Sequence, residues 1–219
     1  MSIAAAVFDM DGVIFDTEQL FFEALRRAAA ETGHEVTRDV FIETLGLPRR
    51  SIPGALERVL GPHFPAPKVV DRHYDLVAEW IGREGPPLKP GVRELLDALT
   101  ARGIPAAVAT STDTEVARSY LDTAGLLDRF LRVVGGDRVA AGKPSPDIFL
   151  HAAAELEAAP AEALVFEDAE IGIQAAVQAG MRVVMIPDVL APTEKLEALC
   201  YAVLPSLNTA AEQIEELIA

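Results

Sequence analysis

The sequence predicts an α/β fold, with a doubly wound parallel sheet of the Rossmann-like kind and an all-helical domain inserted into it. Short apolar runs alternate with longer amphipathic segments through most of the chain, a pattern typical of buried parallel strands covered by helices on both faces. One long segment, residues 18–85, lacks any strand pattern. The simplest arrangement is therefore an α/β domain interrupted after its first strand by a helical insert.

The α/β part is expected to contain four well-defined strands and two weaker ones. The four are residues 4–8, 106–110, 163–166 and 182–186, and the weaker ones are 133–135 and 201–204. Amphipathic helices are expected between them at residues 92–102, 116–124, 146–157 and 171–179.

The insert is expected to hold helices at residues 18–32, 38–45, 51–60 and 67–82. It ends in the stretch "EGPPLKPG", whose proline and glycine residues suit a linker. The predicted domains are thus residues 1–16 with 88–219, which form the α/β core, and residues 17–87, which form the helical domain.

Composition narrows the classes of function. The chain has 219 residues, of which 50% are hydrophobic, and a net charge of -15, which opposes binding to nucleic acid or to anionic membranes. The single cysteine, Cys200, excludes an intrachain disulfide and a cysteine metal cluster. With no signal peptide or membrane-spanning segment evident, we expect a soluble, cytoplasmic protein and a monomer.

Polar side chains follow three of the predicted strands. Asp9 and Asp11 come directly after the first, Thr110 ends the second within "TSTDT", and Glu167 and Asp168 follow the strand at 163–166. The carboxyl ends of parallel strands meet at one edge of a sheet, where ligands bind. Because carboxylates are the ligands that Mg²⁺ prefers, together with substrate phosphate, these side chains can hold a cation and a phosphoryl group.

Two further residue types complete this pattern, and three alternatives fail. Lys143, in the proline-stiffened "GKPSPD", and Ser111 offer groups that bind phosphate oxygens. A nucleotide-binding P-loop is rejected because five residues separate Gly136 from Gly142 and Pro144 follows the lysine. No G-x-G-x-x-G motif supports dinucleotide binding, and the glycine after Asp11 is misplaced for a calcium loop.

The motifs D-x-D-G-V-I-F-D-T, a hydroxyl residue ending the second strand, G-K-P-x-P-D and a later E-D stand in the order seen in one family. The chain resembles the haloacid dehalogenase superfamily of aspartyl-nucleophile phosphohydrolases. The helical insert is similar to the α-helical cap of the β-phosphoglucomutase-like branch. The resemblance covers nearly the whole chain, and the motifs as a set are highly specific.

The resemblance implies that Asp9 attacks phosphorus to form an aspartyl-phosphate. Asp11 would protonate the leaving oxygen and then activate water. It implies that Mg²⁺ is the cofactor, held by the Asp9 carboxylate, the Asp11 backbone carbonyl and Asp168, with Glu167 close by.

The same resemblance implies that Thr110, Ser111 and Lys143 bind the transferring oxygens. In the cap, Arg49 of "GLPRRS" would contact a distal group of the substrate; the alternative is a solvated pair with Arg50 ahead of a helix. Asp16 is expected to be structural, as a hinge or helix cap.

The expected function is therefore Mg²⁺-dependent hydrolysis of a small phosphorylated metabolite, such as a sugar or sugar-acid phosphate. The first alternative is a β-phosphoglucomutase-type mutase, which is weakened because Phe21 stands where the mutase has a histidine. A phosphonate hydrolase needs a cap lysine, and neither Lys68 nor Lys89 has a supporting pattern. The most distant alternative is a non-catalytic binding protein on the same fold.

Overall fold

The chain folds into two compact units. The computed structural model describes residues 3–45, 47, 49–188 and 191–219. One unit comprises Met1–Asp16 and Pro87–Ala219, and the other comprises Thr17–Pro86. Pro87 belongs to the first unit, and its carbonyl accepts a hydrogen bond of 2.8 Å from the backbone N–H of Asp16. The two chain segments that enter and leave the helical unit are therefore hydrogen-bonded to each other.

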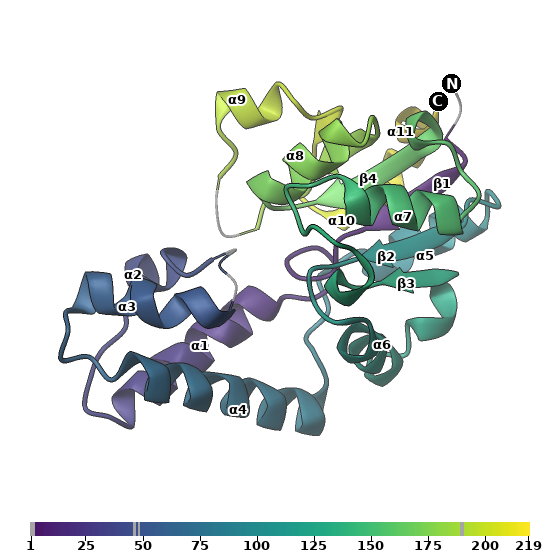
Figure 1. Cartoon of the computed structure of the whole chain (residues 1–219). Coiled ribbons are helices and arrows are strands. Elements are labelled where there is room, and N and C mark those ends of the chain that lie inside the picture. Colours follow the sequence, from purple (N-terminus) through teal and green to yellow (C-terminus); the bar gives the residue numbers. More distant parts are fainter. Residues whose placement is uncertain (1–2, 46, 48, 189–190) are drawn as a thin grey trace. The chain divides into compact units, whose positions relative to one another are not determined.

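The first unit is built on a six-stranded sheet in which every paired strand is parallel (Figure 1). The strands are β1 (Ala5–Phe8), β2 (Ala106–Ala109), β3 (Arg132–Val134), β4 (Ala163–Glu167), β5 (Arg182–Met185) and β6 (Ala202–Val203). Their order across the sheet is β3-β2-β1-β4-β5-β6, which confirms the predicted parallel, doubly wound fold. Because β1 has β2 on one side and β4 on the other, its carboxyl end lies where the winding reverses.

Helices cover both faces of this sheet. They are α5 (Val92–Thr100), α6 (Thr114–Thr123), α7 (Asp147–Glu155), α8 (Glu170–Gln178), α9 (Glu194–Glu197), α10 (Leu207–Glu212) and α11 (Ile214–Ile218), with short 3-10 turns η2 (Leu127–Arg129), η3 (Gly136–Arg138) and η4 (Pro160–Glu162). Successive residues of β1 point to opposite faces: Phe8 joins the core under α5, α6, α10 and α11, while Val7 joins the core under α7 and α8. Both faces are buried, which explains why the strands read as continuous apolar runs.

The predicted strands agree closely with the observed ones, and all six end within one residue of the expected position. The expected strand at 201–204 shrinks to two residues in β6, at the edge of the sheet. Helices α9, α10 and α11 were not predicted, because each has six residues or fewer and shows too little periodicity. Within the described residues, no helix combines the length and apolar character needed to cross a bilayer.

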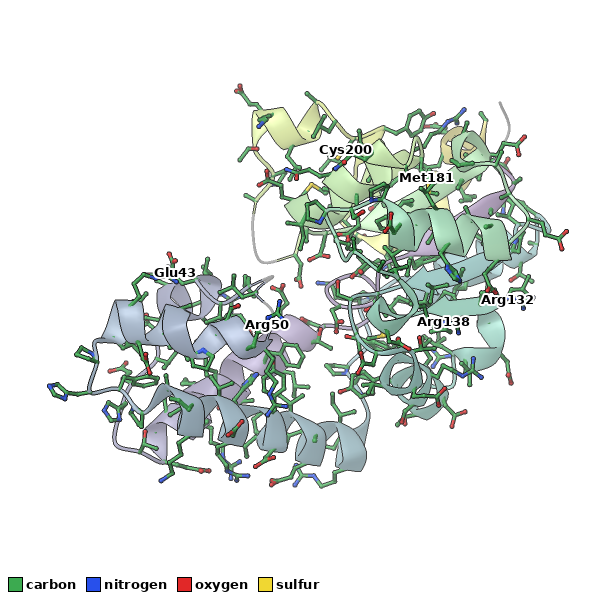
Figure 2. The ribbon with its side chains drawn as sticks, viewed as in Figure 1. Glu43, Arg50, Arg132, Arg138, Met181 and Cys200 are labelled. Atoms are coloured by element: carbon green, nitrogen blue, oxygen red, sulfur yellow. The ribbon has the colours of Figure 1, made fainter. Side chains whose placement is uncertain are left out.

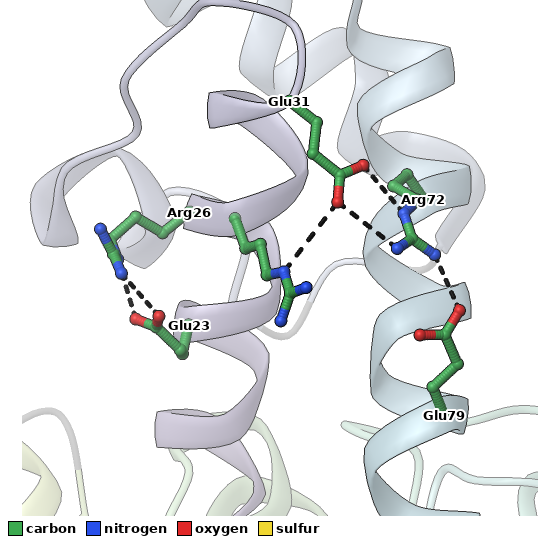
Figure 3. A network of polar contacts seen from close by, with 6 residues as sticks. Glu23, Arg26, Glu31, Arg72 and Glu79 are labelled. Atoms are coloured by element: carbon green, nitrogen blue, oxygen red, sulfur yellow. Dashed lines mark hydrogen bonds and ion pairs between the residues drawn. The ribbon is translucent and has the colours of Figure 1, made fainter.

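The second unit is helical throughout its described residues, as the absence of strand patterns predicts. It contains α1 (Thr17–Ala30), α2 (Arg38–Ile42), the turn η1 (Arg49–Ser51), α3 (Ile52–Leu60) and α4 (Ala66–Glu84). Arg72 of α4 donates hydrogen bonds to two carboxylates (Figure 3). Its Nε lies 2.9 Å from Oε2 of Glu31, which follows α1, and its Nη1 lies 2.9 Å from Oε1 of Glu79, seven residues further along α4. These side chains are partly or fully exposed to solvent, so the ion pairs contribute little to the stability of the helical unit.

His73 is a buried side chain of the helical unit, and its surroundings favour the neutral imidazole. It is 5% exposed, and its ring meets the rings of Phe21 and Tyr74 edge-on at centroid distances of 5.7 and 4.7 Å. Its Nδ1 has no hydrogen-bond partner among the described residues. Burial, aided by the nearby Arg49 guanidinium, lowers the pKa of His73 to about 4.

This environment predicts acid sensitivity of the helical unit. Between pH 6.5 and pH 4 the unfolded chain binds a proton at His73 that the folded chain does not, so stability falls as the pH is lowered through this window. The loss should reach about 3 kcal/mol near pH 4. Urea unfolding followed by the fluorescence of Trp80, the only tryptophan, measures it at a series of pH values.

The matched variant His73→Leu should lose this part of the pH dependence while it retains the contribution of the surface carboxylates. An unfolding free energy whose slope between pH 6.5 and 4 is the same in both proteins would contradict the assignment to His73.

Candidate active site

The candidate active site lies at the carboxyl edge of the sheet and is centred on a buried ammonium group. The Lys143 side chain is 3% exposed, and its Nζ donates to Oδ1 of Asp9 and, at 2.6 Å, to Oε1 of Glu167. Asp9 follows β1 and Glu167 ends β4, so two neighbouring strands and a separate loop converge on one charge. The sequence interpretation grouped these three residues, and the structure brings them into direct contact.

Glu167 is held in place by its backbone neighbourhood. Its Oε2 accepts hydrogen bonds of 2.7 Å from the backbone N–H groups of Asp168 and Ala169, and the residue is 1% exposed. Gly172, in the first turns of α8, leaves room for this carboxylate, since a Cβ there would overlap it. Glu167 is therefore anchored on three sides, which suits a group that positions Lys143.

Burial and neighbouring charges shift the protonation of the central pair. Burial is the largest influence on Asp9 and raises its pKa, the Lys143 ammonium opposes that rise, and the Glu167 and Asp11 carboxylates add to it. Burial by itself would lower the pKa of Lys143, but the charges of Asp9 and Glu167 outweigh it and raise that pKa. The ammonium thus stays protonated, and the raised pKa of Asp9 reflects a surplus of carboxylate groups over the one ammonium that balances them.

That surplus fits a divalent cation. One carboxylate oxygen each from Asp9, Glu167 and Asp168 lies within 4.8 Å of the others. All are hard oxygen donors of the kind that Mg²⁺ prefers. Gly12 has a φ of 83° and leaves no room for a Cβ beside the Asp168 carboxylate, so this turn brings the backbone close to the donor set.

The loop after β2 supplies the hydroxyl groups. Thr110 is 1% exposed, and its hydroxyl accepts a hydrogen bond of 3.1 Å from the backbone N–H of Thr112. Ser111 is exposed at the turn. Thr112 donates from its own hydroxyl to Oδ2 of Asp11 at 3.1 Å, a contact that sequence reasoning missed. The third hydroxyl of "TSTDT" was the available signal, but only the fold shows which carboxylate it reaches.

The loop that follows β3 is hydrogen-bonded to the loop that follows β2. Asp137, in the turn after β3, accepts from both the backbone N–H and the hydroxyl of Thr114, each at 2.7 Å. Gly135 and Gly136 pass so close to the loop that a Cβ on either would overlap its backbone. These contacts lower the pKa of Asp137, with the Thr114 hydroxyl as the first cause. The two adjacent glycines in "VVGGD" were the sequence feature that could have indicated this close approach of the two loops.

Other predicted residues lie outside this cluster. Arg49 belongs to the helical unit, where it pairs with Asp71 at 3.0 Å and lies 4.3 Å from the Tyr74 ring. Gly46 and Pro48 of its loop lie outside the described residues. Lys89, considered as a phosphonate-hydrolase lysine, belongs to the α/β unit and pairs with Asp188 at 2.5 Å, so it offers no free amine there.

The fold and the converging acidic, hydroxyl and lysine groups define a hydrolase class whose sequence model matches this chain. Residues 6–186 match the haloacid dehalogenase-like hydrolase model, and the chain belongs to that family. It is 37% identical over 180 residues to the phosphorylated carbohydrates phosphatase of Thermotoga maritima, covering 81% of this chain and 82% of that one.

Two other proteins are similar over most of the chain. The β-phosphoglucomutase of Bacillus subtilis is 33% identical over 188 residues, which are 81% of this chain and 80% of that protein. The crystal structure of a Thermotoga maritima protein provisionally assigned as a β-phosphoglucomutase superimposes with a TM-score of 0.82 at 32% identity, over 98% of this chain and 100% of that one. The predicted family is thereby confirmed.

The space that Gly172 leaves for Glu167 yields a prediction. Gly172→Ala should destabilise the protein by about 2 kcal/mol, because the Glu167 carboxylate must move away from Lys143 and from its backbone donors. Glycine-to-alanine changes within helices normally stabilise by up to about 1 kcal/mol. The free energy of unfolding of the variant and of the natural sequence is measured by chemical denaturation.

Gly54→Ala in α3 is the matched control, since no atom lies within 4 Å of the Cβ that it adds. It should keep or raise the free energy of unfolding. A Gly172→Ala protein as stable as the natural one would show that Glu167 is not held against this glycine.

Proposed function

We propose that this chain is a Mg²⁺-dependent phosphatase that hydrolyses a small phosphorylated metabolite, most simply a sugar or sugar-acid phosphate. The observation that carries the proposal is the Lys143 ammonium held between Asp9 and Glu167, beside Asp168. The similarity to a phosphorylated carbohydrates phosphatase supports the substrate class.

Asp9 is the proposed nucleophile. One of its carboxylate oxygens forms a bond to phosphorus while the bond from phosphorus to the substrate oxygen breaks, which yields an aspartyl-phosphate and an alcohol. Lys143 and the hydroxyl of Thr110 stabilise the negative charge on the transferring oxygens, together with the exposed turn at Ser111. Mg²⁺, held by Asp9, Asp168 and the Asp11 backbone carbonyl with Glu167 nearby, would offset the repulsion between the carboxylate and the anionic phosphate.

Asp11 is the proposed acid and base. In the first step it gives its proton to the departing alcohol oxygen, and in the second it takes a proton from the water that attacks the aspartyl-phosphate. The hydroxyl of Thr112, 3.1 Å from Oδ2 of Asp11, would fix the orientation of this carboxyl between the two steps. After hydrolysis, inorganic phosphate leaves and Asp9 is restored.

The helical unit is the proposed cap that selects the substrate. Arg49 is exposed, and its position over Tyr74 restricts the guanidinium to one side of the unit, where it would bind an anionic or hydroxyl group distant from the phosphate. The paired segments at Asp16 and Pro87 are the proposed hinge for opening and closing.

Hydrolysis is favoured over the mutase reaction by the residue at position 21. Phe21 has no proton to exchange, and its ring packs edge-on against His73. A non-catalytic role on this fold is disfavoured, because Asp9, Asp11, Lys143 and Asp168 are all present.

The first test is phosphate release from a panel of sugar, sugar-acid, polyol and nucleotide monophosphates. Release should require Mg²⁺, stop with EDTA, and fall at least about a thousandfold in Asp9→Asn, because an amide is a poor nucleophile. The thermal unfolding of Asp9→Asn, measured in parallel, shows that the variant is folded.

Release that persists in Asp9→Asn would overturn the nucleophile assignment. Isomerisation of β-glucose 1-phosphate without phosphate release would instead establish the mutase.

The contact between Thr112 and Asp11 gives a separate prediction. Thr112→Val removes the donated hydrogen bond and should lower kcat about tenfold with little change in KM, since Asp11 acts in the chemical steps. Thr112→Ser keeps the hydroxyl and should restore most of the rate. Equal rates in the valine and serine variants would show that the contact does not orient Asp11.

A further inference from the structure

The β3 edge of the sheet carries a cavity that contains none of the proposed catalytic, metal-binding or phosphate-binding residues, although its lining includes Thr114, the residue held by Asp137. The edge strand is β3, with α6 packed on one face of the sheet and α7 on the other. The cavity has a volume of about 340 Å³. That size matches pockets for small molecules. Its lining includes Arg118 of α6, Leu131 and Arg132 of the edge segment, Arg138 of the following turn, and His151 and Glu155 of α7.

The net charge of the side chains that line this cavity is opposite in sign to the net charge of the whole chain. The chain has a net charge of -15 and only 19 lysine and arginine residues, whereas this cavity is lined by three arginines and two carboxylates, Glu115 and Glu155. Figure 2 shows Arg132 and Arg138 near the sheet edge. Since like charges elsewhere would repel an anion, this local excess of cationic groups is the feature that could hold one.

The guanidinium groups are only partly used within the protein. Arg132 forms an ion pair of 2.9 Å with Glu155, whose other oxygen lies 3.4 Å from Nε2 of His151. Arg118 and Arg138 form no ion pair within the described ranges, and both are exposed. The guanidinium groups of Arg118 and Arg138 are therefore available to a ligand. A guanidinium group can donate two parallel hydrogen bonds to the oxygens of a phosphate or a carboxylate.

We infer that this cavity is a binding site for a small dianion of the phosphate-monoester class, separate from the proposed catalytic site. Arg118 and Arg138 bind the anionic group, and Glu155 and Glu115 on the lining accept hydrogen bonds from hydroxyl groups of the ligand. Strand pairing by another protein chain fits this edge less well, because β3 has only three residues and carries the charged Arg132. The inference is independent of the proposed hydrolysis.

The test is a titration of the whole ¹⁵N-labelled protein with inorganic phosphate, followed residue by residue by NMR. The amide signals of residues 131–134 and 138 should shift with saturation in the millimolar range. Arg118→Gln/Arg138→Gln should weaken the binding seen at these signals at least about tenfold, because two charge-assisted contacts are lost. The backbone fold of the variant is checked from its remaining signals.

Arg58→Gln/Lys195→Gln is the matched control, since it removes the same charge from two exposed side chains outside the cavity lining. It should leave the affinity at the β3 signals within about twofold, which separates direct contact from long-range attraction. Signals at β3 that do not respond to phosphate, or that respond equally in the arginine double variant, would overturn the inference. Shifts at β3 that depend on protein concentration and not on phosphate would assign the edge to contact between chains.

Discussion

The compensation of one buried charge is the constraint on which the candidate site depends. An unpaired ammonium or carboxylate taken out of water is strongly unfavourable, and breaking a buried pair typically costs about 3–5 kcal/mol. Lys143 and its partners Asp9 and Glu167 are each nearly excluded from solvent, so none of the three can be placed without the others. This mutual requirement fixes the loop that carries Lys143 against the ends of β1 and β4.

The sheet makes that arrangement possible. Parallel pairing brings the carboxyl ends of β1, β2 and β4 to one edge, and β1 lies where the direction of winding reverses. The loops at this edge then support one another, since Thr112 reaches Asp11 and Asp137 holds Thr114. The same topology leaves β3 as an unpaired edge between α6 and α7, where the arginine-lined cavity opens. One fold thus supplies two environments of opposite charge.

The two units divide the proposed work. Every group assigned to the chemistry lies in the α/β unit, while Arg49 and its neighbours Tyr74 and Asp71 lie in the helical unit. The helical unit is joined to the α/β unit through two hydrogen-bonded chain segments and, among the described residues, contributes none of the buried charges around Lys143. Substitutions in the helical unit would therefore leave those charges in place. Under the proposed function, this separation would let the substrate-selecting unit vary while the reactive centre stays the same.

The class of fold, the helical insert and the grouping of Asp9, Lys143 and Asp168 could be predicted from the amino-acid sequence, because strand patterns and the residues at strand ends are local properties of the chain. The sequence also indicated the family through the order of its motifs. Three other features are visible only in the folded chain: Thr112 contacts Asp11, Asp137 binds Thr114, and Arg118 and Arg138 line one cavity. These residues are separated by up to 101 positions, so their contacts follow from how the strands and loops pack in space. The short helices after β5 were missed for a related reason, since packing on the sheet stabilises them more than their own sequence does.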